Sequence, residues 1–386
     1  MRAFDDLAER FGYGLVITPL FESTELFSRG VGADTEVVEK QMYTFDDKGG
    51  RPVALRPEAT ASVVRAYLQA GTQGVFKAAY SGPMFRYEQP QAGRRRQFHQ
   101  VGVEYVGESS PDADVEVIEI GFRLLEAVGI SDATVLLNSI GDPQDRVAYR
   151  DLLTAFLAER ADRLSPDARR RMVTNPLRVL DSKADAAVIA DAPVPADHLG
   201  PAAAEHIAAV RSGLDAIGIP HRDEPRLVRG LDYYNRTVFE YQSASYQAAQ
   251  AALGGGGRYD PLAGMLGGPD TPGVGVAMGV DRIVLAMPAA EARSSLDLFV
   301  VAADPAHRAT ALGLVRTLRS SGVSADLDLG GKSVKAQFRA ADRRGASAVA
   351  VVGEEWASGR VTVKDLKSGA ESSVEAQEVA AWIRRR

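Results

Sequence analysis

Residues 81–105 read SGPMFRYEQPQAGRRRQFHQVGVEY, and the rest of the chain is interpreted around this stretch. Apolar and polar side chains alternate in Met84–Glu88 and again in Phe98–Tyr105, which is the pattern of two strands. The segment between them, Gln89–Arg96, holds a proline, a glycine and three consecutive arginines, as a hairpin loop can. The stretch therefore predicts a β-hairpin.

The inner face of this predicted hairpin is polar. Arg86 and Glu88 share one face of the first strand, and Gln100 and Glu104 share one face of the second. Unpaired buried charge is costly, so a hairpin that only packed against a core would not need these side chains. Two interpretations stay open here: a functional surface, or a solvated polar face with a basic loop.

Length and composition predict a soluble globular protein of two or three domains, because 386 residues exceed one ordinary core. No apolar run reaches the roughly 18 residues that cross a bilayer, so no membrane association is expected. The N-terminus has no basic segment followed by an apolar one, so no export is expected. The absence of cysteine excludes disulfides, thiolate zinc sites and cysteine nucleophiles, and fits a cytoplasmic protein.

The net charge of −6 argues against coating nucleic acid over the whole surface, but a local basic surface stays possible. Residues 297–386 contain 14 Lys/Arg and 11 Asp/Glu, a net charge of +3. An acidic body with a mildly basic tail domain is expected.

The first part of the chain alternates between helical and strand patterns. Residues 2–10 predict a helix, residues 15–18 a strand that ends at Pro19, and residues 39–46 include another strand. Glu58 and Thr60 lie at a predicted strand-to-helix junction, where they either project into a cleft or cap the helix. A helix over 112–128 and a strand over 135–139 precede a helical insertion at about 146–222.

Residues 238–241 then predict a strand and residues 253–260, LGGGGRYD, a glycine-rich bend through which backbone can approach a ligand. Residues 273–278 predict a strand and 281–287 a helix with Arg282 in its first turn. The glycines at 273–279 lack the spacing of a dinucleotide fingerprint, and Gly331-Lys332-Ser333 lacks the leading glycine of a phosphate loop.

The tail follows a linker at 288–295 and has the order βαβαβ, which predicts a parallel sheet. Four cations of its second helix fall on one stripe, which is either a solvated face or an RNA contact. These are Lys332, Lys335, Arg339 and Arg343.

Several ordered segments resemble the class II aminoacyl-tRNA synthetases, and within them the histidyl-tRNA synthetase family. FRYEQPQAGRRRQFHQVGVE (85–104) and GVGVAMGVDRIVLAM (273–287) are similar to the second and third motifs of the class. LVRGLDYYNRTVFEY (227–241) and LGGGGRYD (253–260) are similar to the two signatures of the family, and NPLRVLDSK (175–183) and KSVKAQFRAADRRGA (332–346) agree with it. The resemblance covers almost the entire chain.

The resemblance implies an α+β fold: an antiparallel six-stranded sheet with flanking helices and the helical insertion, then an α/β anticodon-binding domain. The expected boundaries are 1–290 for the catalytic domain and 296–386 for the anticodon-binding domain. The implied reaction forms histidyl-adenylate from histidine and ATP and transfers the histidyl group to the 3′ end of histidine tRNA. A homodimer is implied, with the opening helix and the strand to Pro19 at its interface.

Carried over residue by residue, the resemblance implies that Arg86, Glu88, Arg94 and Arg282 bind ATP. Arg86 and Arg229 would act in catalysis by stabilising the charge that develops at the α-phosphate. Mg²⁺ would accompany ATP, with no protein ligands assigned, and Lys332, Lys335, Arg339 and Arg343 would contact tRNA. The histidine-binding residues would be Glu58, Ala59, Thr60, Arg86, Gln100, Glu104, Arg229, Tyr233, Tyr234 and Tyr259.

The sequence departs from the family pattern in a few places. Members of the family usually start further upstream, with a strand that carries an RG-x-x-D signature, whereas this sequence begins inside the helix of the first motif. Two interpretations stay open: the start is truncated or wrongly chosen, with consequences for the interface and the closure of the pocket, or the strand is dispensable. Ala59, Gln89 and Asp281 stand where glycine, arginine and glutamate are common. Two alternatives follow: a catalytically silent paralogue serving as regulatory subunit of ATP phosphoribosyltransferase, and a nucleic-acid-binding regulator without adenylation activity.

Overall fold

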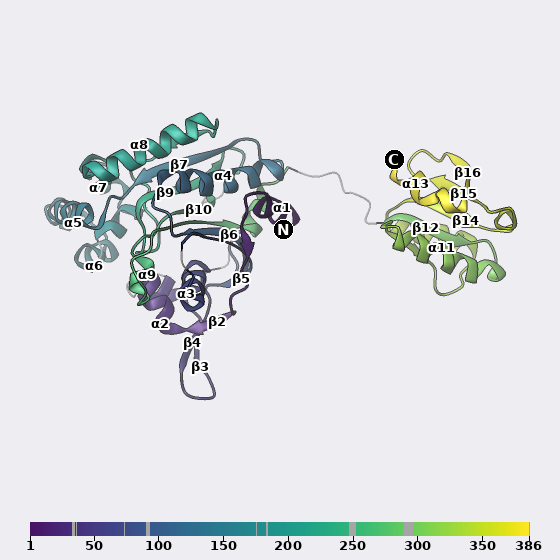
Figure 1. The fold of residues 1–386 in the computed structure, drawn as a ribbon, viewed down its shortest axis with the longest axis horizontal. Helices are drawn as coiled ribbons and strands as arrows, with labels where there is room; N and C mark the ends of the chain where they lie inside the picture. The colour runs from purple at the N-terminus through teal and green to yellow at the C-terminus, as the bar shows by residue number, and fades with distance from the viewer. Residues whose placement is uncertain are drawn as a thin grey trace. The chain divides into compact units, whose positions relative to one another are not determined.

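The computed structural model describes residues 1–32, 35, 37–72, 74–89, 93–174, 176–182, 184–246, 252–288 and 296–385. The chain divides into two compact units, Met1–Pro288 and Ala289–Arg386, which are coloured from purple to green and from green to yellow in Figure 1. Of the linker predicted at 288–295, residues 289–295 lie outside the described residues, as does the centre of the predicted hairpin loop at 90–92. None of the described helices is long and apolar enough to cross a membrane.

The first unit is built on an eight-stranded sheet with the order β1-β5-β6-β11-β10-β9-β7-β8. The six inner strands are antiparallel, as expected, but β1 and β8 each add a short parallel strand at an edge. The six-stranded sheet implied by the resemblance lacks these two edges. The strand predicted over 15–18 is present only as Gly14–Leu15, and the three-residue β8 was not predicted because so short a segment carries no readable alternation. The strands are β1 (Gly14–Leu15), β5 (Phe76–Phe85), β6 (Gln97–Val106), β7 (Ala133–Ser139), β8 (His221–Asp223), β9 (Asn235–Ser243), β10 (Ala252–Arg258) and β11 (Gly273–Gly279).

The predicted hairpin is formed by β5 and β6, which pair from Phe76 with Val106 to Phe85 with Gln97. Its first strand starts earlier than expected and ends at Phe85, so Arg86 and Glu88 lie just beyond it. Beyond Phe85 the Arg86 N–H still donates across the hairpin to the Arg96 carbonyl at 2.9 Å, and the Glu88 N–H turns back to donate to the Arg86 carbonyl at 2.8 Å. Arg86 and Glu88 therefore lie where the regular pairing of the two strands ends.

The glycine-rich stretch is a strand, not a bend. Gly254–Gly257 form the middle of β10 and pair with both β9 and β11. A Cβ on Gly256 would lie 1.9 Å from the Gly275 carbonyl oxygen, and one on Gly257 would lie 2.5 Å from the Thr237 carbonyl oxygen. The glycines are therefore required by close neighbours on adjacent strands, which local sequence does not reveal.

Helices cover both faces of the sheet (Figure 1). On one face α1 (Arg2–Arg10), α4 (Pro111–Ala127) and α8 (Pro201–Ala216) bury side chains such as Leu7, Ile118 and Val210 against Val103 and Leu137. On the other face lie α2 (Thr24–Phe27), α3 (Thr60–Ala70), α9 (Leu262–Met265) and a small sheet of β2 (Phe21–Ser23), β4 (Pro52–Leu55) and β3 (Thr44–Asp46). Two single π-helical turns, Ser28–Gly32 and Val37–Gln41, follow α2. The second overlaps the start of the segment 39–46, in which a strand was expected, and β3 forms only the end of that segment. After β11, α10 (Val280–Ala286) leads to the end of the unit.

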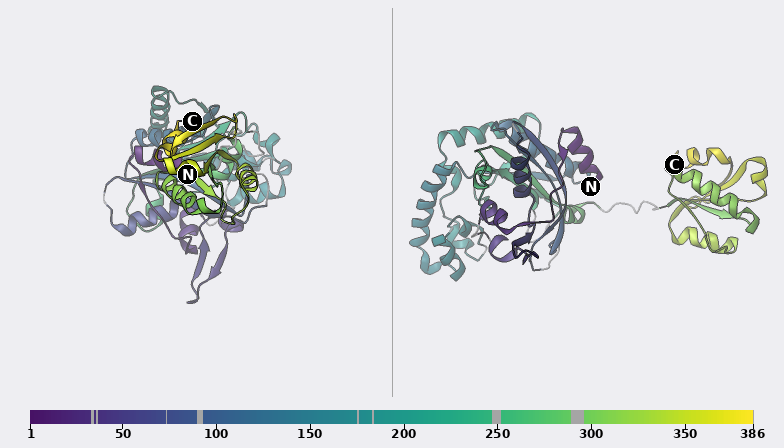
Figure 2. Two further views of the ribbon diagram at one scale, coloured as in Figure 1. Left: turned by 90° about the vertical axis from the view of Figure 1, so that its right-hand side faces the viewer. Right: turned by 60° about the horizontal axis from the view of Figure 1, so that its bottom comes forward.

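The predicted helical insertion gathers at one end of the sheet, as Figure 2 shows in its right-hand view. It has a small core of its own, in which Tyr149, Leu153 and Val179 are buried. Its α-helices are α5 (Pro143–Ala158), α6 (Pro166–Thr174), α7 (Ala186–Ile189) and α8. The insertion is thus joined to the sheet at the start of α5 and along α8.

The second unit has a five-stranded sheet with the order β13-β12-β14-β15-β16. The predicted βαβαβ order is present, with β12, β13 and β14 parallel, and an antiparallel hairpin of β15 and β16 extends it. Helix α11 packs on one face and α12 on the other. The elements are β12 (Leu296–Ala302), α11 (Arg308–Ser320), β13 (Ala325–Leu327), α12 (Val334–Arg343), β14 (Ala346–Val352), β15 (Arg360–Asp365), β16 (Glu371–Glu375) and α13 (Val379–Arg384).

Candidate active site

A cavity of about 1050 Å³ lies over the centre of the eight-stranded sheet. Its walls come from the hairpin, the start of α3, the loop before β9, the strands β9, β10 and β11, and the start of α10. Most of the predicted site residues line it: Glu58, Thr60, Arg86, Glu88, Arg94, Gln100, Arg229, Tyr233, Tyr234, Tyr259 and Arg282. Segments as far apart in sequence as those of Glu58 and Arg282 therefore meet at one place.

Two predicted residues lie behind the cavity wall and do not line it. Ala59 is packed in a small apolar cluster, and Glu104 is completely buried on β6. Glu104 is reached from the cavity through its two hydrogen-bond donors: Thr60 Oγ1 donates to Oε1 and Tyr259 OH donates to Oε2, both at 2.6 Å. Burial raises the pKa of Glu104 to about 8, although both hydrogen bonds favour the ionised form.

Glycine at position 275 leaves room for the Glu104 carboxylate directly behind the cavity wall. Gly275 on β11 pairs with Glu104 and lines the cavity, and a Cβ at this position would lie 1.8 Å from Glu104 Oε2. Any larger residue would displace the carboxylate.

At the strand-to-helix junction, Glu58 both faces the cavity and caps the helix, which were the two alternatives left open by the sequence. Glu58 lines the cavity, and its carboxylate also accepts hydrogen bonds from the N–H groups of Thr60 (2.7 Å) and Ala61 (3.0 Å) at the start of α3. Burial raises the pKa of Glu58. The helix start thus fixes an acidic group at the cavity wall.

Two arginines from distant segments are held by backbone carbonyls at the cavity. Arg86 Nε donates to the Pro57 carbonyl at 2.8 Å, and its guanidinium lies 5.3 Å from the centre of the Phe98 ring. Arg282, in the first turn of α10 as predicted, donates to the carbonyls of Ala252 (3.0 Å) and Gly93 (3.3 Å). Burial lowers the pKa of both arginines, yet a guanidinium stays protonated in proteins. The cavity therefore contains fixed positive charge.

The hairpin loop contributes further cations. Arg94 Nε lies 3.2 Å from Glu88 Oε2, so these two predicted site residues form an ion pair. Arg95 is largely exposed, 3.6 Å from Asp281, and the Arg96 guanidinium lies 4.1 Å from the centre of the Tyr87 ring. The packing of Arg96 on an aromatic ring gives it a structural partner that the sequence did not predict.

Arg229 forms an ion pair with Glu240, a cavity residue on β9 that the sequence analysis did not single out. Burial is the largest single influence and would lower the pKa of Arg229, but the charge and hydrogen bond of Glu240, together with Tyr234 and Tyr233, raise the pKa. The alternation of β9 could have placed Glu240 on the same face as Gln242, which also lines the cavity.

Four buried polar atoms of residues that line this cavity have no hydrogen-bond partner among the described residues. They are Nε of Arg229, a donor, Oε1 of Gln100, an acceptor, the hydroxyl of Tyr80, and Oε2 of Glu88, which has only its ion pair with Arg94. Buried polar atoms are normally hydrogen-bonded, so unsatisfied atoms in a cavity indicate that a polar ligand completes the site.

The insertion also reaches the cavity, which the sequence did not predict. Arg170 and Arg171 of α6 line it together with Lys40, and both arginines pair with Asp167, at 2.6 Å and 3.0 Å. These two arginines of the insertion therefore add positive charge to the mouth of the site.

In the second unit, the predicted cationic stripe is exposed. Lys335, Arg339 and Arg343 lie on α12, with Lys332 just before its start, while Val334 and Phe338 turn toward the sheet. The stripe is therefore available to an anionic partner.

Among the described residues, no group of three or more His, Cys, Asp or Glu side chains could hold a metal ion. The cavity does offer separate carboxylates, including Glu88 and Glu240. A donor set of this kind fits a cation that arrives on phosphate oxygens, because Mg²⁺ is usually held by one or two carboxylates plus substrate phosphates.

Comparison with known proteins gives consistent matches for both units. Residues 1–283 match the family model of histidyl-tRNA synthetase, and residues 297–386 match that of the anticodon binding domain. A histidine–tRNA ligase of Rubrobacter xylanophilus is 47% identical over 378 residues, which cover 96% of this chain and 88% of that protein. Many further curated proteins of this name match as well, among them one of Geobacillus kaustophilus at 45% identity, over 98% of this chain and 92% of that protein.

The fold agrees with the same family. The crystal structure of apo histidyl-tRNA synthetase from S. aureus superimposes with a TM-score of 0.80 at 33% identity, covering 99% of this chain and 94% of that one. A structure from Bacillus halodurans, described as an ATP phosphoribosyltransferase regulatory subunit/histidyl-tRNA synthetase, gives a TM-score of 0.63 at 22% identity, over 89% of this chain and 90% of that one. This second likeness is one of fold.

Proposed function

The chain belongs to the histidyl-tRNA synthetase family, and we propose that the cavity over its sheet is where histidine and ATP are joined as histidyl-adenylate. The activity of the chain is the ATP-dependent ligation of histidine to tRNA. Identity of 47% over most of both chains favours this activity over that of the regulatory subunit, which is represented by a likeness in fold. The matching ligases likewise disfavour a regulator without adenylation activity.

The observation that carries the proposal is the convergence of arginines and unsatisfied polar atoms on one cavity. Arg86, Arg229 and Arg282 come from three separate segments and all line it. Attack of the histidine carboxylate on the α-phosphorus of ATP develops negative charge on the phosphate oxygens, and diphosphate leaves. Guanidinium groups that are already in place stabilise this charge without reorganising. No side-chain nucleophile is needed, because the substrate carboxylate attacks.

We assign the ATP side of the cavity to the residues near the hairpin loop. Arg86 binds the α-phosphate, Glu88 lies toward the adenine, and Arg94 and Arg282 hold the outer phosphates. The unpartnered Nε of Arg229 supports a second contact to the α-phosphate. Glu88 and Glu240 are cavity carboxylates that would hold Mg²⁺ entering with ATP, and the ion would supply positive charge to the phosphates.

We assign the histidine side to the region around Thr60 and the tyrosines. Glu58, Thr60 and Gln100, beside the Ala59 backbone, bind the ammonium group, for which Gln100 Oε1 supplies an unsatisfied acceptor. Tyr233 and Tyr259 shape the pocket, while Tyr234 and the carboxyl of Glu104 hydrogen-bond the two imidazole nitrogens. A pocket with buried polar groups rejects apolar amino acids by roughly 10⁴-fold or more, because they leave those groups unpaired.

The second unit is proposed to bind the tRNA through its anticodon, with Lys332, Lys335, Arg339 and Arg343 contacting phosphates. The proposed catalytic and anticodon-binding domains cover 1–290 and 296–386. We also propose a cytoplasmic homodimer in which the N-terminal segment meets a second copy. Leu15 and Ile17 support this, because their exposed fractions of 66% and 85% are high for apolar side chains beside an edge strand.

The proposal is tested by ATP–pyrophosphate exchange with the purified chain. Exchange is expected with histidine and not with the other amino acids. A pure, folded chain that shows no histidine-dependent exchange would contradict the proposed active site.

A further inference from the structure

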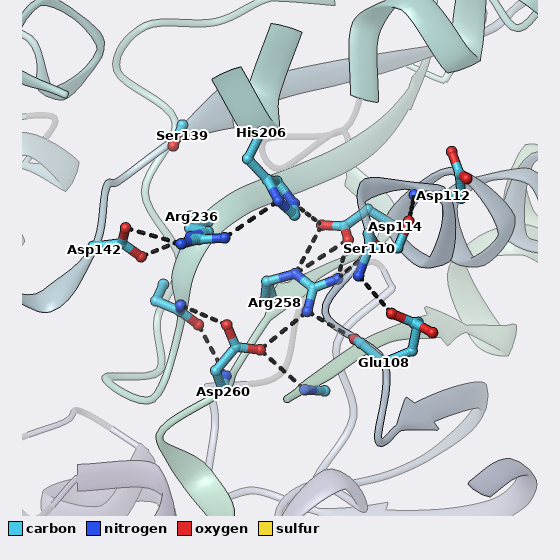
Figure 3. Close-up of polar contacts among 12 residues, drawn as sticks. Glu108, Ser110, Asp112, Asp114, Ser139, Asp142, His206, Arg236, Arg258 and Asp260 are labelled. Atoms are coloured by element: carbon cyan, nitrogen blue, oxygen red, sulfur yellow. Dashed lines mark hydrogen bonds and ion pairs between the residues drawn. The ribbon is translucent and has the colours of Figure 1, made fainter. Parts of the chain in front are cut away.

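A cluster of charged side chains from α4, α8, β9 and β10 lies outside the cavity (Figure 3). Arg258 directly precedes Tyr259, and Arg236 follows Tyr234 by two residues. Arg258 and Asp114 have no exposed surface, and His206 is only 4% exposed. The proposed catalysis uses none of them, although burying such groups costs free energy unless every one is satisfied.

Arg258 is fully satisfied and joins three parts of the first unit. Its guanidinium donates to both oxygens of Asp114 on α4, to the carbonyls of Glu108 and Ser110 before that helix, and to Asp260 Oδ1 at 3.1 Å. Asp260 in turn accepts from the Gly273 N–H and from Asn235 Nδ2, each at 3.0 Å. The backbone on both sides of Tyr259 is therefore tied to α4, β9 and β11.

His206 on α8 connects this arrangement to a second arginine. Arg236 Nη1 lies 3.4 Å from His206 Nδ1, and His206 Nε2 lies 3.3 Å from Asp114 Oδ1. A guanidinium can only donate, so Nδ1 must accept, and the imidazole proton must be on Nε2, from which it is donated to Asp114. Hydrogen bonds are therefore donated in one direction, from Arg236 to His206 and from His206 to Asp114.

Arg236 has the only positive φ, 47°, among the described residues other than glycine. Such a backbone is strained and persists only where its surroundings hold it. Here Arg236 makes two hydrogen bonds to Asp142, from Nε at 2.7 Å and from Nη2 at 3.1 Å. Asp142 caps the N-terminus of α5, so the strained residue beside the tyrosines is held by the start of the insertion.

A third contact from the insertion reaches the same loop. Arg146, in the first turn of α5, donates to the carbonyl of Tyr234 at 2.8 Å and to that of Asp232 at 3.3 Å. The backbone of the loop that carries Tyr233 and Tyr234 is thus held by a side chain of α5. The helix α8 contributes to the cluster through His206.

We propose that His206, Arg236 and Arg258 are positioning residues that set where Tyr234 and Tyr259 lie in the histidine pocket. Through them the insertion helices α5 and α8 fix the pocket from behind. This inference rests on the proposed function, because it concerns the affinity and selectivity of the same pocket. A cluster with a merely structural role would affect the amount of folded protein and not its affinity for histidine.

The test uses the full chain with His206→Phe, which keeps an aromatic ring and removes both hydrogen bonds. The Michaelis constants for histidine and for ATP are measured by pyrophosphate exchange, and active sites are counted. His206→Phe is expected to raise the constant for histidine about tenfold and to leave that for ATP within about twofold. His206→Gln, whose amide can both accept and donate, is expected to restore most of the loss.

The matched control is His221→Phe on β8, whose imidazole contacts the Ile219 carbonyl at 3.1 Å and no member of the cluster. Arg236→Lys, which retains charge but loses the paired contact to Asp142, gives a second measurement if His206→Phe does not fold. Unchanged constants for histidine in both variants, with only fewer active sites, would overturn the inference while leaving the proposed function intact. A parent chain without histidine-dependent exchange would overturn both.

Discussion

The hydroxyl of Tyr259 donates a 2.6 Å hydrogen bond to Glu104, which has no exposed surface of its own. Tyr259 lines the cavity and Glu104 lies directly behind it. The buried carboxyl therefore influences a ligand through the Tyr259 hydroxyl, unless the ligand displaces this hydrogen bond. Four predictions follow from this and related features of the site.

Glu104→Ala is expected to weaken histidine much more than ATP. The substitution removes the acceptor for both Thr60 and Tyr259 and leaves their hydroxyl groups unpaired on the histidine side. A rise of at least about tenfold in the Michaelis constant for histidine, with that for ATP nearly unchanged, is expected in pyrophosphate exchange. Equal losses for the two substrates would contradict the assignment of Glu104 to the histidine pocket.

The same carboxyl is expected to make stability depend on pH. Because its pKa is raised from 4.5 to about 8, the folded protein binds a proton between these values that the unfolded chain has released. Its contribution to stability is therefore fully present below about pH 4.5 and is lost as pH rises through about 8.

Glu104→Gln, which mimics the protonated carboxyl, is expected to remove this slope of up to about 1.4 kcal/mol per pH unit. The difference in the free energy of unfolding between parent and variant, measured in urea from pH 5 to pH 9, should therefore grow in favour of the variant. A constant difference over this range would show that Glu104 is ionised throughout.

Arg229→Ala is expected to lower the rate of histidyl-adenylate formation by about 10²-fold or more while histidine binding stays measurable. The reason is that Arg229 lines the cavity, has a buried donor at Nε without a partner, and already has its charge compensated by Glu240. Single-turnover rates and equilibrium binding of histidine distinguish the two effects. Arg226→Ala, an exposed arginine just outside the cavity, is the control and should behave like the parent. A variant of Arg229 with near-normal exchange would argue against its role.

Replacing Lys335 and Arg339 together by alanine is expected to spare pyrophosphate exchange and to raise the Michaelis constant for tRNA in aminoacylation. Both side chains are exposed on α12, so the change should cost little stability. Each lost phosphate contact should also reduce the salt dependence of tRNA binding by about one unit of slope. Lys367→Ala, an exposed lysine elsewhere in the second unit, serves as control. Charging at normal tRNA affinity and an unchanged salt slope would mean that the stripe is a solvated face.

Much of the fold was predictable because its signals are local. Alternation identified the hairpin of β5 and β6, helical spacing identified α1 and α4, and the order of the second unit followed from its strand and helix lengths. The glycine-rich segment was predicted wrongly because the requirement for glycine at 256 comes from the carbonyl of Gly275 on the neighbouring strand. The two short edge strands likewise exist only through pairing with their neighbours.

The sequence by itself determined the membership of the family and the residue types of the site, because these depend on ordered motifs. Only the tertiary structure decided that Glu104 lies behind the cavity, that Glu240 is the partner of Arg229, and that Arg170 and Arg171 reach the mouth of the site. It also brought Arg236, His206 and Asp114 into one chain of contacts from segments about 30 and 90 residues apart. Burial and ion pairing depend on neighbours that are distant in sequence, and these neighbours exist only once the sheet and the insertion have formed.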